Sequence, residues 1–120
     1  MSVTRINPSM WTQGVSNITV QNVSRFSTGQ IGAARYGRLI LVTLFGTANF
    51  NAWEDNVRIC TLDGVSFDGN ANTGLIYVQD TGRCLHLFGS GNGVYVRNKN
   101  GVSFGSGTWM FGDMTGFSST

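Results

Sequence analysis

The acidic side chains are the first candidates for chemistry, because carboxyl groups can act as general acids, bases or nucleophiles. The chain has six of them, and they are Glu54, Asp55, Asp63, Asp68, Asp80 and Asp113. Glycoside hydrolysis needs two carboxyl groups at a set separation across a cleft, and the sequence leaves open that an acid at 54–55 meets Asp68 or Asp113. Most of the aspartates adjoin glycine, however, which is typical of tight turns. We therefore expect no catalytic residues, with a small hydrolase as the alternative.

Asp80-Thr81-Gly82 matches the triplet of aspartic proteases, in which a homodimer sets one aspartate from each chain side by side. That motif has apolar residues before the aspartate and usually alanine after the glycine, whereas Gln79 and Arg83 stand there in this chain. The pattern favours an ordinary turn between two strands.

The only histidine, His86, lies between Leu85 and Leu87. A general base needs a nucleophile or an orienting acid beside it, and the neighbouring positions supply neither. We expect His86 on a core or subunit face, with a sugar contact as the alternative. One histidine and two cysteines lack the spacing of metal ligands, so we predict no metal and no cofactor. For Cys60 and Cys84 we favour two reduced thiols, with a disulfide between neighbouring strands as the alternative.

The segment 49–56 combines two aromatic residues, three asparagines and two acids. Saccharide sites use an aromatic face for the apolar side of a sugar, and planar amides or carboxylates for its hydroxyl groups. We predict a sugar contact at Trp53, with Asp55, Asn51 and Arg58 as hydrogen-bond partners. The alternative is that Trp53 plugs the end of the fold and that the acids are solvated.

A second candidate surface consists of Tyr95, Arg97 and Lys99, which alternate along the chain and so share one face of a strand. The alternative is an ordinary exposed strand face.

The composition restricts the fold to the all-β class. The chain has 17 glycines in 120 residues and 12% charged residues, against averages of about 7% glycine and about 25% charge. Helical bundles need more Ala, Leu, Glu and Lys, and disordered chains have fewer apolar residues than the 41% found here. Eight Lys and Arg residues spread along the chain do not form the dense basic patch of a nucleic-acid binder. No apolar run approaches the roughly 18 residues of a membrane span. Residues 1–10 lack the apolar core of a secretory signal, so we expect that they are not one.

Turn residues every 8 to 12 positions separate short apolar segments, which is the pattern of a β-sandwich or barrel. We read residues 1–14 as an N-terminal arm or linker and residues 15–120 as one domain. About eight or nine short strands are expected. They fall within 15–26 (one strand or a broken pair), 29–37, 38–46, 57–62, 65–67, 75–79, 83–88, 94–98, 102–104 and 108–112.

The segment 39–45 is apolar on both of its alternating faces. An antiparallel strand usually buries one face and exposes the other, so this pattern predicts that both faces are covered. One cover is the rest of the domain, and the simplest second cover is another copy of the chain in a symmetric oligomer. We expect Leu39, Leu41, Phe45, His86 and Phe88 to supply subunit contacts.

Three runs of residues resemble a pattern in receptor-binding proteins of tailed-phage fibres and baseplates. In that pattern a Gly/Ala-rich strand turns through a glycine into an apolar strand, as residues 29–46 do, followed by a short strand such as 57–62. The run from Thr81 to Leu87, continuing to Asn92-Gly93-Val94, is similar to a late hairpin of that family, as is the closing Thr108–Gly112. The likeness covers residues 15–114. This sequence departs from the family in lacking an obvious long shaft, of which we expect residues 1–14 to be at most a stub.

The resemblance implies a trimeric β-sandwich at the tip of a virion tail, made in the host cytoplasm, that binds a host-surface saccharide. No binding residues of the family carry over by motif. We therefore expect a jelly-roll-like β-sandwich, a homotrimer and a non-catalytic receptor-binding module, without nucleic-acid binding or membrane insertion. Residues 1–14 would contact other virion tail proteins. The alternative is a structural virion protein, such as a capsid decoration or a piece of a head fibre.

Overall fold

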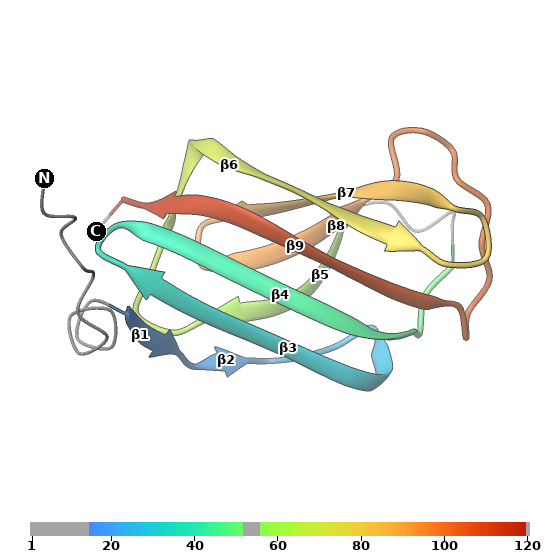
Figure 1. Cartoon of the computed structure of the whole chain (residues 1–120), viewed down its shortest axis with the longest axis horizontal. Coiled ribbons are helices and arrows are strands. Elements are labelled where there is room, and N and C mark those ends of the chain that lie inside the picture. The colour runs from blue at the N-terminus through green and yellow to red at the C-terminus, as the bar shows by residue number, and fades with distance from the viewer. Residues whose placement is uncertain (1–14, 52–55, 120) are drawn as a thin grey trace, which may run out of the picture.

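The computed structural model describes residues 15–51 and 56–119, which form nine β-strands and no helix. Figure 1 shows their arrangement. The all-β prediction is confirmed. The strands are β1 (Val15–Ile18), β2 (Val20–Gln21), β3 (Phe26–Tyr36), β4 (Leu39–Ala48), β5 (Val57–Leu62), β6 (Phe67–Val78), β7 (Arg83–Ser90), β8 (Gly93–Arg97) and β9 (Trp109–Ser118). No helix in this described part of the chain is long and apolar enough to cross a membrane.

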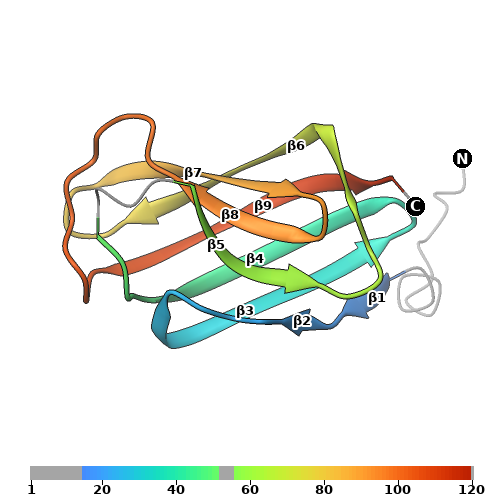
Figure 2. The same cartoon turned by 180° about the vertical axis from the view of Figure 1, so that it is seen from behind.

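All nine strands belong to one antiparallel sheet, in the order β1-β3-β4-β9-β6-β7-β8-β5-β2. The two strands at the ends of this order, β1 and β2, are separated in sequence by Thr19 alone, so the sheet curls until it is nearly a closed barrel. The barrel is flattened: β5 and β8 lie behind β3 and β4 in Figure 1 and in front of them in Figure 2. Opposite parts of the sheet therefore pack against each other.

The core lies between these two layers and follows the alternation of side chains along each strand. On β4, Ile40, Val42 and Leu44 are buried, while the intervening positions are exposed. The same alternation buries the inward residues of the other strands, which include Ile76, Val78, Leu85, Leu87, Val94, Val96, Met110 and Met114. The inner face of the 39–45 segment is buried as predicted, whereas its outer face is exposed in the single chain. The cover expected on that outer face stays a prediction.

The prediction that one strand ends at 67, before Asp68-Gly69, and that the next strand begins at 75 is wrong. One continuous strand, β6, spans Phe67–Val78. Its pairing with β9 shifts register between Phe67 and Asn72, so the Asp-Gly pair lies in an irregular stretch inside the strand. Asn72 Nδ2 donates a hydrogen bond to the Asp68 carbonyl at 3.0 Å, and Asn72 Oδ1 accepts one from the Gly89 backbone at 2.9 Å. These bonds replace those that a turn would have made.

The expected strand at 102–104 is also wrong, because the backbone of Val102 pairs with a side chain and not with a neighbouring strand. Asn98 Nδ2 donates to the Val102 carbonyl at 2.8 Å, and Asn98 Oδ1 accepts from the Val102 N–H at 2.9 Å. Val102 is buried and Phe104 packs against the core. This segment therefore closes one end of the barrel.

β9 extends well beyond the predicted 108–112, through Gly112 to Ser118. Gly112 lies inside the strand, where its lack of a side chain lets the backbones of β9 and β6 approach each other closely. A Cβ at this position would overlap the carbonyl oxygen of Leu75 on β6. Glycine here therefore lets β9 and β6 curl tightly, which is a use of glycine in addition to marking turns.

Candidate functional site

Residues 49–51, 79–82 and 98–108 gather at one end of the barrel (Figure 1). Phe50 anchors this end. Its ring is 2% exposed and meets the rings of Phe26 and Phe104 edge-on, with centroid distances of 6.0 and 5.4 Å. Phe50 is thus a buried plug at this end of the barrel. Trp53 and Asp55 themselves lie outside the described residues.

Backbone hydrogen bonds tie the start of the segment 49–56 to its neighbours. The Asn49 N–H donates to the Arg25 carbonyl at 2.6 Å, and the Ala48 N–H donates to the Thr108 carbonyl at 2.8 Å. Asn51 Oδ1 accepts from the Ser106 N–H at 3.1 Å. The side-chain oxygen of Asn51 therefore joins two loops, a role that its sequence position did not indicate.

Arg58, the fourth predicted sugar contact, lies on the outer side of β5, directly across from Tyr95 of β8. Tyr95 in turn lies across from Phe88 of β7. The structure therefore joins Arg58 to the second predicted surface, that of Tyr95, Arg97 and Lys99. Tyr95 and Arg97 are half-buried and Lys99 is exposed.

Three rings form a continuous stack on this surface. His86 and Phe88 stack at 5.2 Å between centroids, and Phe88 and Tyr95 stack at 5.5 Å. Burial lowers the pKa of His86, and the positive charges of Lys99 and Arg97 lower it further. We call the surface formed by Arg58, Arg97, Lys99 and the stacked rings of His86, Phe88 and Tyr95 the cationic face.

A second outer surface is strongly apolar. The sheet turns a set of large side chains on β3, β4, β9 and β6 toward solvent, each between 37% and 59% exposed. We call this set the apolar face, and it consists of Tyr36, Leu39, Leu41, Phe45, Leu75, Trp109, Phe111 and Phe117. Asp113 is the only charged residue among the outward positions of β3, β4 and β9.

The predicted subunit contacts divide between these two surfaces. Leu39, Leu41 and Phe45 belong to the apolar face. His86 and Phe88 lie on β7, with β9 and β6 between them and β4, and both are half-buried.

The aromatic residues of β9 and the exposed Leu75 of β6 also belong to the apolar face, although they were not predicted as contacts from the sequence. The signal that identifies the β9 residues is the alternation of Trp109, Phe111 and Phe117 with inward residues, which Gly112 obscures when it is taken as a strand end.

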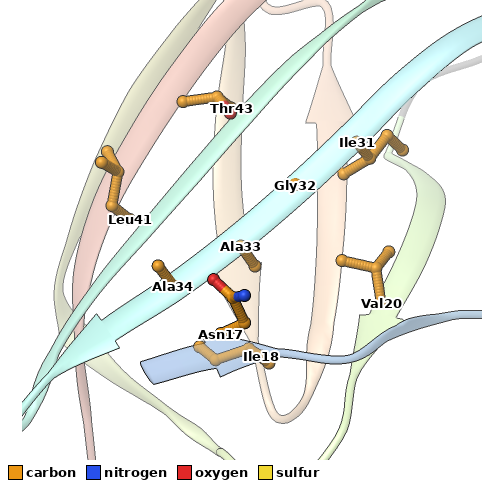
Figure 3. Close-up of a pocket in the computed structure, with 9 residues that line it drawn as sticks. All are labelled: Asn17, Ile18, Val20, Ile31, Gly32, Ala33, Ala34, Leu41 and Thr43. Carbon is orange, nitrogen blue, oxygen red and sulfur yellow. The ribbon is translucent and has the colours of Figure 1, made fainter. Parts of the chain in front are cut away.

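A hollow of about 510 Å³ adjoins the apolar face at the seam between β1 and β3 (Figure 3). Small residues line part of it, namely Gly32, Ala33 and Ala34, and Leu41 of the apolar face also contributes. Asn17 lies beside Ala34 in Figure 3 and supplies an amide. None of the lining residues is charged.

The aspartates of the described segments are spread over the fold. Asp63 and Asp80 lie in turns, whereas Asp68 and Asp113 lie within strands. Asp80-Thr81-Gly82 is a turn in which the Gly82 N–H donates to the Val78 carbonyl at 3.0 Å and Gly82 has a φ of 67°. Within residues 15–51 and 56–119, no group of three His, Cys, Asp or Glu side chains gathers as metal ligands would.

The two cysteines are not bonded to each other. Cys60 is buried and Cys84 is half-buried, and β8 separates their strands. Burial raises the pKa of the Cys60 thiol to about 12, because a thiolate is poorly stabilised away from water.

In comparisons with known proteins, no family model, no curated protein and no solved structure matches this chain.

Proposed function

We propose that this chain is a non-catalytic, self-associating binding module. The observation that carries the proposal is the apolar face, whose members stay exposed in the single chain. Monomeric soluble proteins rarely expose a large contiguous apolar patch, and such patches usually mark interaction surfaces. Leu and Phe dominate this one, and they lack the polar groups with which Trp and Tyr hold sugars. Its chemistry therefore fits a protein partner better than a saccharide.

The partner that fits best is a second copy of the chain. The net charge of +2 gives little repulsion between copies, and one aspartate is the only charge on the outer side of β3, β4 and β9. A ring of three copies needs two different surfaces that fit each other. We propose that the hollow at Gly32–Ala34 receives the aromatic residues of β9 from the neighbouring copy. These features support the homotrimer. The jelly-roll-like form remains an expectation from the resemblance.

The role we propose for the oligomer is that of a receptor-binding head at the tip of a phage tail, which recognises a host-surface saccharide. The resemblance of residues 15–114 supports this role, with residues 1–14 contacting other virion proteins. We expect sugar binding at Trp53, Asp55, Asn51 and Arg58. The described members of this set support it, because Asn51 follows the buried Phe50 and Arg58 is exposed on β5.

The first test is the mass in solution, measured by light scattering. Three copies of the 13.0 kDa chain would weigh about 39 kDa, which is the expected result. A monomer at every concentration would overturn the proposal of self-association.

The second test is binding to host cell walls and to a glycan array, with Trp53→Ala as the variant. We expect weaker binding by this variant and unchanged binding by Val15→Ala, since Val15 is an exposed apolar residue of β1 that pairs with Tyr36, away from residues 49–51. Equal binding by Trp53→Ala and the parent would remove Trp53 from the site. A chain that binds virions through residues 1–14, and binds no glycan, would instead be a structural virion protein.

A further inference from the structure

The chain contains two Asn-Gly pairs, Asn92-Gly93 and Asn100-Gly101, and the fold places them in opposite environments. An Asn-Gly pair can react with itself, because glycine has no side chain that shields its backbone nitrogen from the asparagine before it. This reaction turns the asparagine into an acid and needs no enzyme or cofactor. It requires the peptide group between the two residues to rotate, so the local structure decides where it occurs.

Asn100-Gly101 lies at the tip of the loop that follows β8 and projects from the barrel, drawn in orange in Figure 1. Lys99, Asn100 and Gly101 are all exposed. Within residues 15–51 and 56–119, the Gly101 N–H and the side-chain amide of Asn100 form no hydrogen bond. The Asn100 carbonyl accepts from Arg83 Nη2 at 3.4 Å, which is long for a hydrogen bond. This peptide group is therefore weakly held.

The rest of the loop fixes only the base of this tip. Asn98 bonds to both backbone groups of Val102, with its Nδ2 at 2.8 Å from the carbonyl oxygen and its Oδ1 at 2.9 Å from the nitrogen. Val102 itself is buried. Residues 99–101 can therefore rearrange while the packed base of the loop stays in place.

Asn92-Gly93 is held on both sides. Gly93 is buried at the start of β8, where it pairs with Ser90 of β7 and with Thr61 of β5. The Asn92 carbonyl belongs to the same peptide group as the Gly93 nitrogen, and it accepts from the Leu62 N–H at 2.7 Å. This peptide group can rotate only after β8 detaches from its neighbours.

We propose that Asn100 is a site of spontaneous deamidation in the folded chain, and that the fold protects Asn92 from the same reaction. The Gly101 nitrogen loses its proton to hydroxide and attacks Cγ of Asn100. The new N–Cγ bond closes a cyclic imide, and the side-chain nitrogen leaves as ammonia. Water then opens the imide at either carbonyl carbon, which leaves aspartate or isoaspartate at position 100. In total one water is consumed and one ammonia is released.

The modified loop would carry a new carboxylate, which lowers the net charge of +2 by one. Lys99 precedes this position, and Arg83 contacts its carbonyl, so cations lie near the new charge. The isoaspartate form also lengthens the backbone, which an exposed loop tip tolerates. The inference depends neither on self-association nor on sugar binding.

The test follows the full chain over time near pH 8, both in buffer and in enough urea to unfold it. Trypsin separates the two sites, because cleavage after Arg83, Arg97 and Lys99 leaves Asn92 in the peptide 84–97 and Asn100 in the peptide 100–120. Mass spectrometry of each peptide measures the replacement of the amide by an acid. A sample digested before the incubation gives the amount that forms during digestion.

In the folded chain, Asn100 should convert at least about tenfold faster than Asn92, because conversion of Asn92 must wait for local opening of β8. In urea the two sites should convert at similar rates, since both are then unstructured Asn-Gly pairs. Conversion of Asn100 should also be faster at higher pH, because hydroxide removes the Gly101 proton. Equal rates at the two sites in the folded chain would overturn the inference. So would an unchanged Asn100 in buffer after the urea sample has converted.

The variant Gly101→Ala should slow the conversion of Asn100 several-fold in buffer and in urea, because the added methyl group shields the attacking nitrogen. The urea sample excludes an effect of the variant on the fold. Gly105→Ala is the matched control, since it lies in the same loop and a Cβ there meets open space. It should convert as the parent does. Equal rates for Gly101→Ala and the parent would rule out attack by the Gly101 nitrogen.

Discussion

Phe45 of β4 lies directly across from Phe111 of β9, and each ring is 45% exposed on the outer side of the sheet. Two further rings adjoin this pair. The ring centroid of Trp109 lies 5.8 Å from that of Phe45, and the ring centroid of Tyr77 lies 5.0 Å from that of Phe111. Four aromatic rings thus form one row across β4, β9 and β6. This row is the centre of the apolar face and the first place to test self-association.

Replacing Phe111 by Asp should abolish self-association while leaving the fold intact, because Phe111 points away from the core and a buried carboxylate at an interface is costly. Sedimentation should show a fall to the mass of one chain. The matched control is Ser103→Asp, at an exposed position in the loop 98–108, which should keep the parent mass. An unchanged mass for Phe111→Asp would place the interface elsewhere.

Gly112→Ala should destabilise the fold by about 1–3 kcal/mol, because the added methyl group would overlap the backbone of Leu75 and force β9 and β6 apart. Gly105→Ala is the control, since a Cβ there meets open space. It should change stability by less than about 1 kcal/mol. Urea unfolding of both variants measures the difference, and equal stability would mean that the strands do not approach so closely.

Phe50→Ala should cost about 3–5 kcal/mol, because it removes a buried ring with two edge-on aromatic partners. It should also speed proteolysis within the 49–56 segment, because position 50 loses its packing against the core. Val23→Ala, at a position 54% exposed, should change stability by no more than about 0.5 kcal/mol. Denaturant unfolding and limited digestion with chymotrypsin, which can cleave after Trp53, give the two readouts. A small loss for Phe50→Ala would show that the barrel end is not a packed plug.

The two thiols should react at very different rates with a thiol reagent near pH 8. Cys60 is buried with its pKa raised to about 12, so it should be modified only after unfolding, whereas the half-buried Cys84 should react in the native protein. In Cys84→Ser the fast reaction should vanish. Fast reaction of Cys60 in the folded chain would contradict its burial.

Burial of the neutral Cys60 thiol also favours folding below pH 9. This contribution to stability falls as the pH rises from 9 toward 12.

Stability should fall as the pH drops through the ordinary histidine pKa of 6.5, because the pKa of His86 is lowered in the folded chain. Below that pH the unfolded chain binds a proton more readily than the folded chain, so acid favours unfolding. His86→Gln should flatten this dependence between about pH 7 and pH 5. Equal slopes for the parent and the variant, measured by urea unfolding at each pH, would count against this effect.

The sequence predicts the bounds of a strand closely where the local residue pattern agrees with the pairing of that strand in the sheet. β5 falls at its predicted bounds because Asp63-Gly64 follows with a glycine φ of 75° that suits a turn. β4 is predicted with its correct inner face because its alternation is unbroken. β6 is mispredicted because Asp68-Gly69 looks like a turn locally, while Asn72 and the pairing with β9 keep it in a strand.

The binding surfaces were harder to predict because they depend on which strands become neighbours. Arg58 and Tyr95 are far apart in the chain, and only the pairing of β5 with β8 brings them together. The role of Asn51 follows from its contact with Ser106, which no spacing in the sequence indicates. The strand order is likewise not readable from the sequence, since β9 inserts between β4 and β6.

That position of β9 has a consequence for the order of events during synthesis. β4 and β6 each pair with β9 and not with each other. Residues 109–118 form the last of the nine strands in the sequence, so they leave the ribosome after the other eight. Until they do, the nascent chain has two unpaired strand edges, which are prone to join other chains. The sheet can therefore close only after translation has passed Ser118, and we expect chaperones to hold the incomplete chain until then.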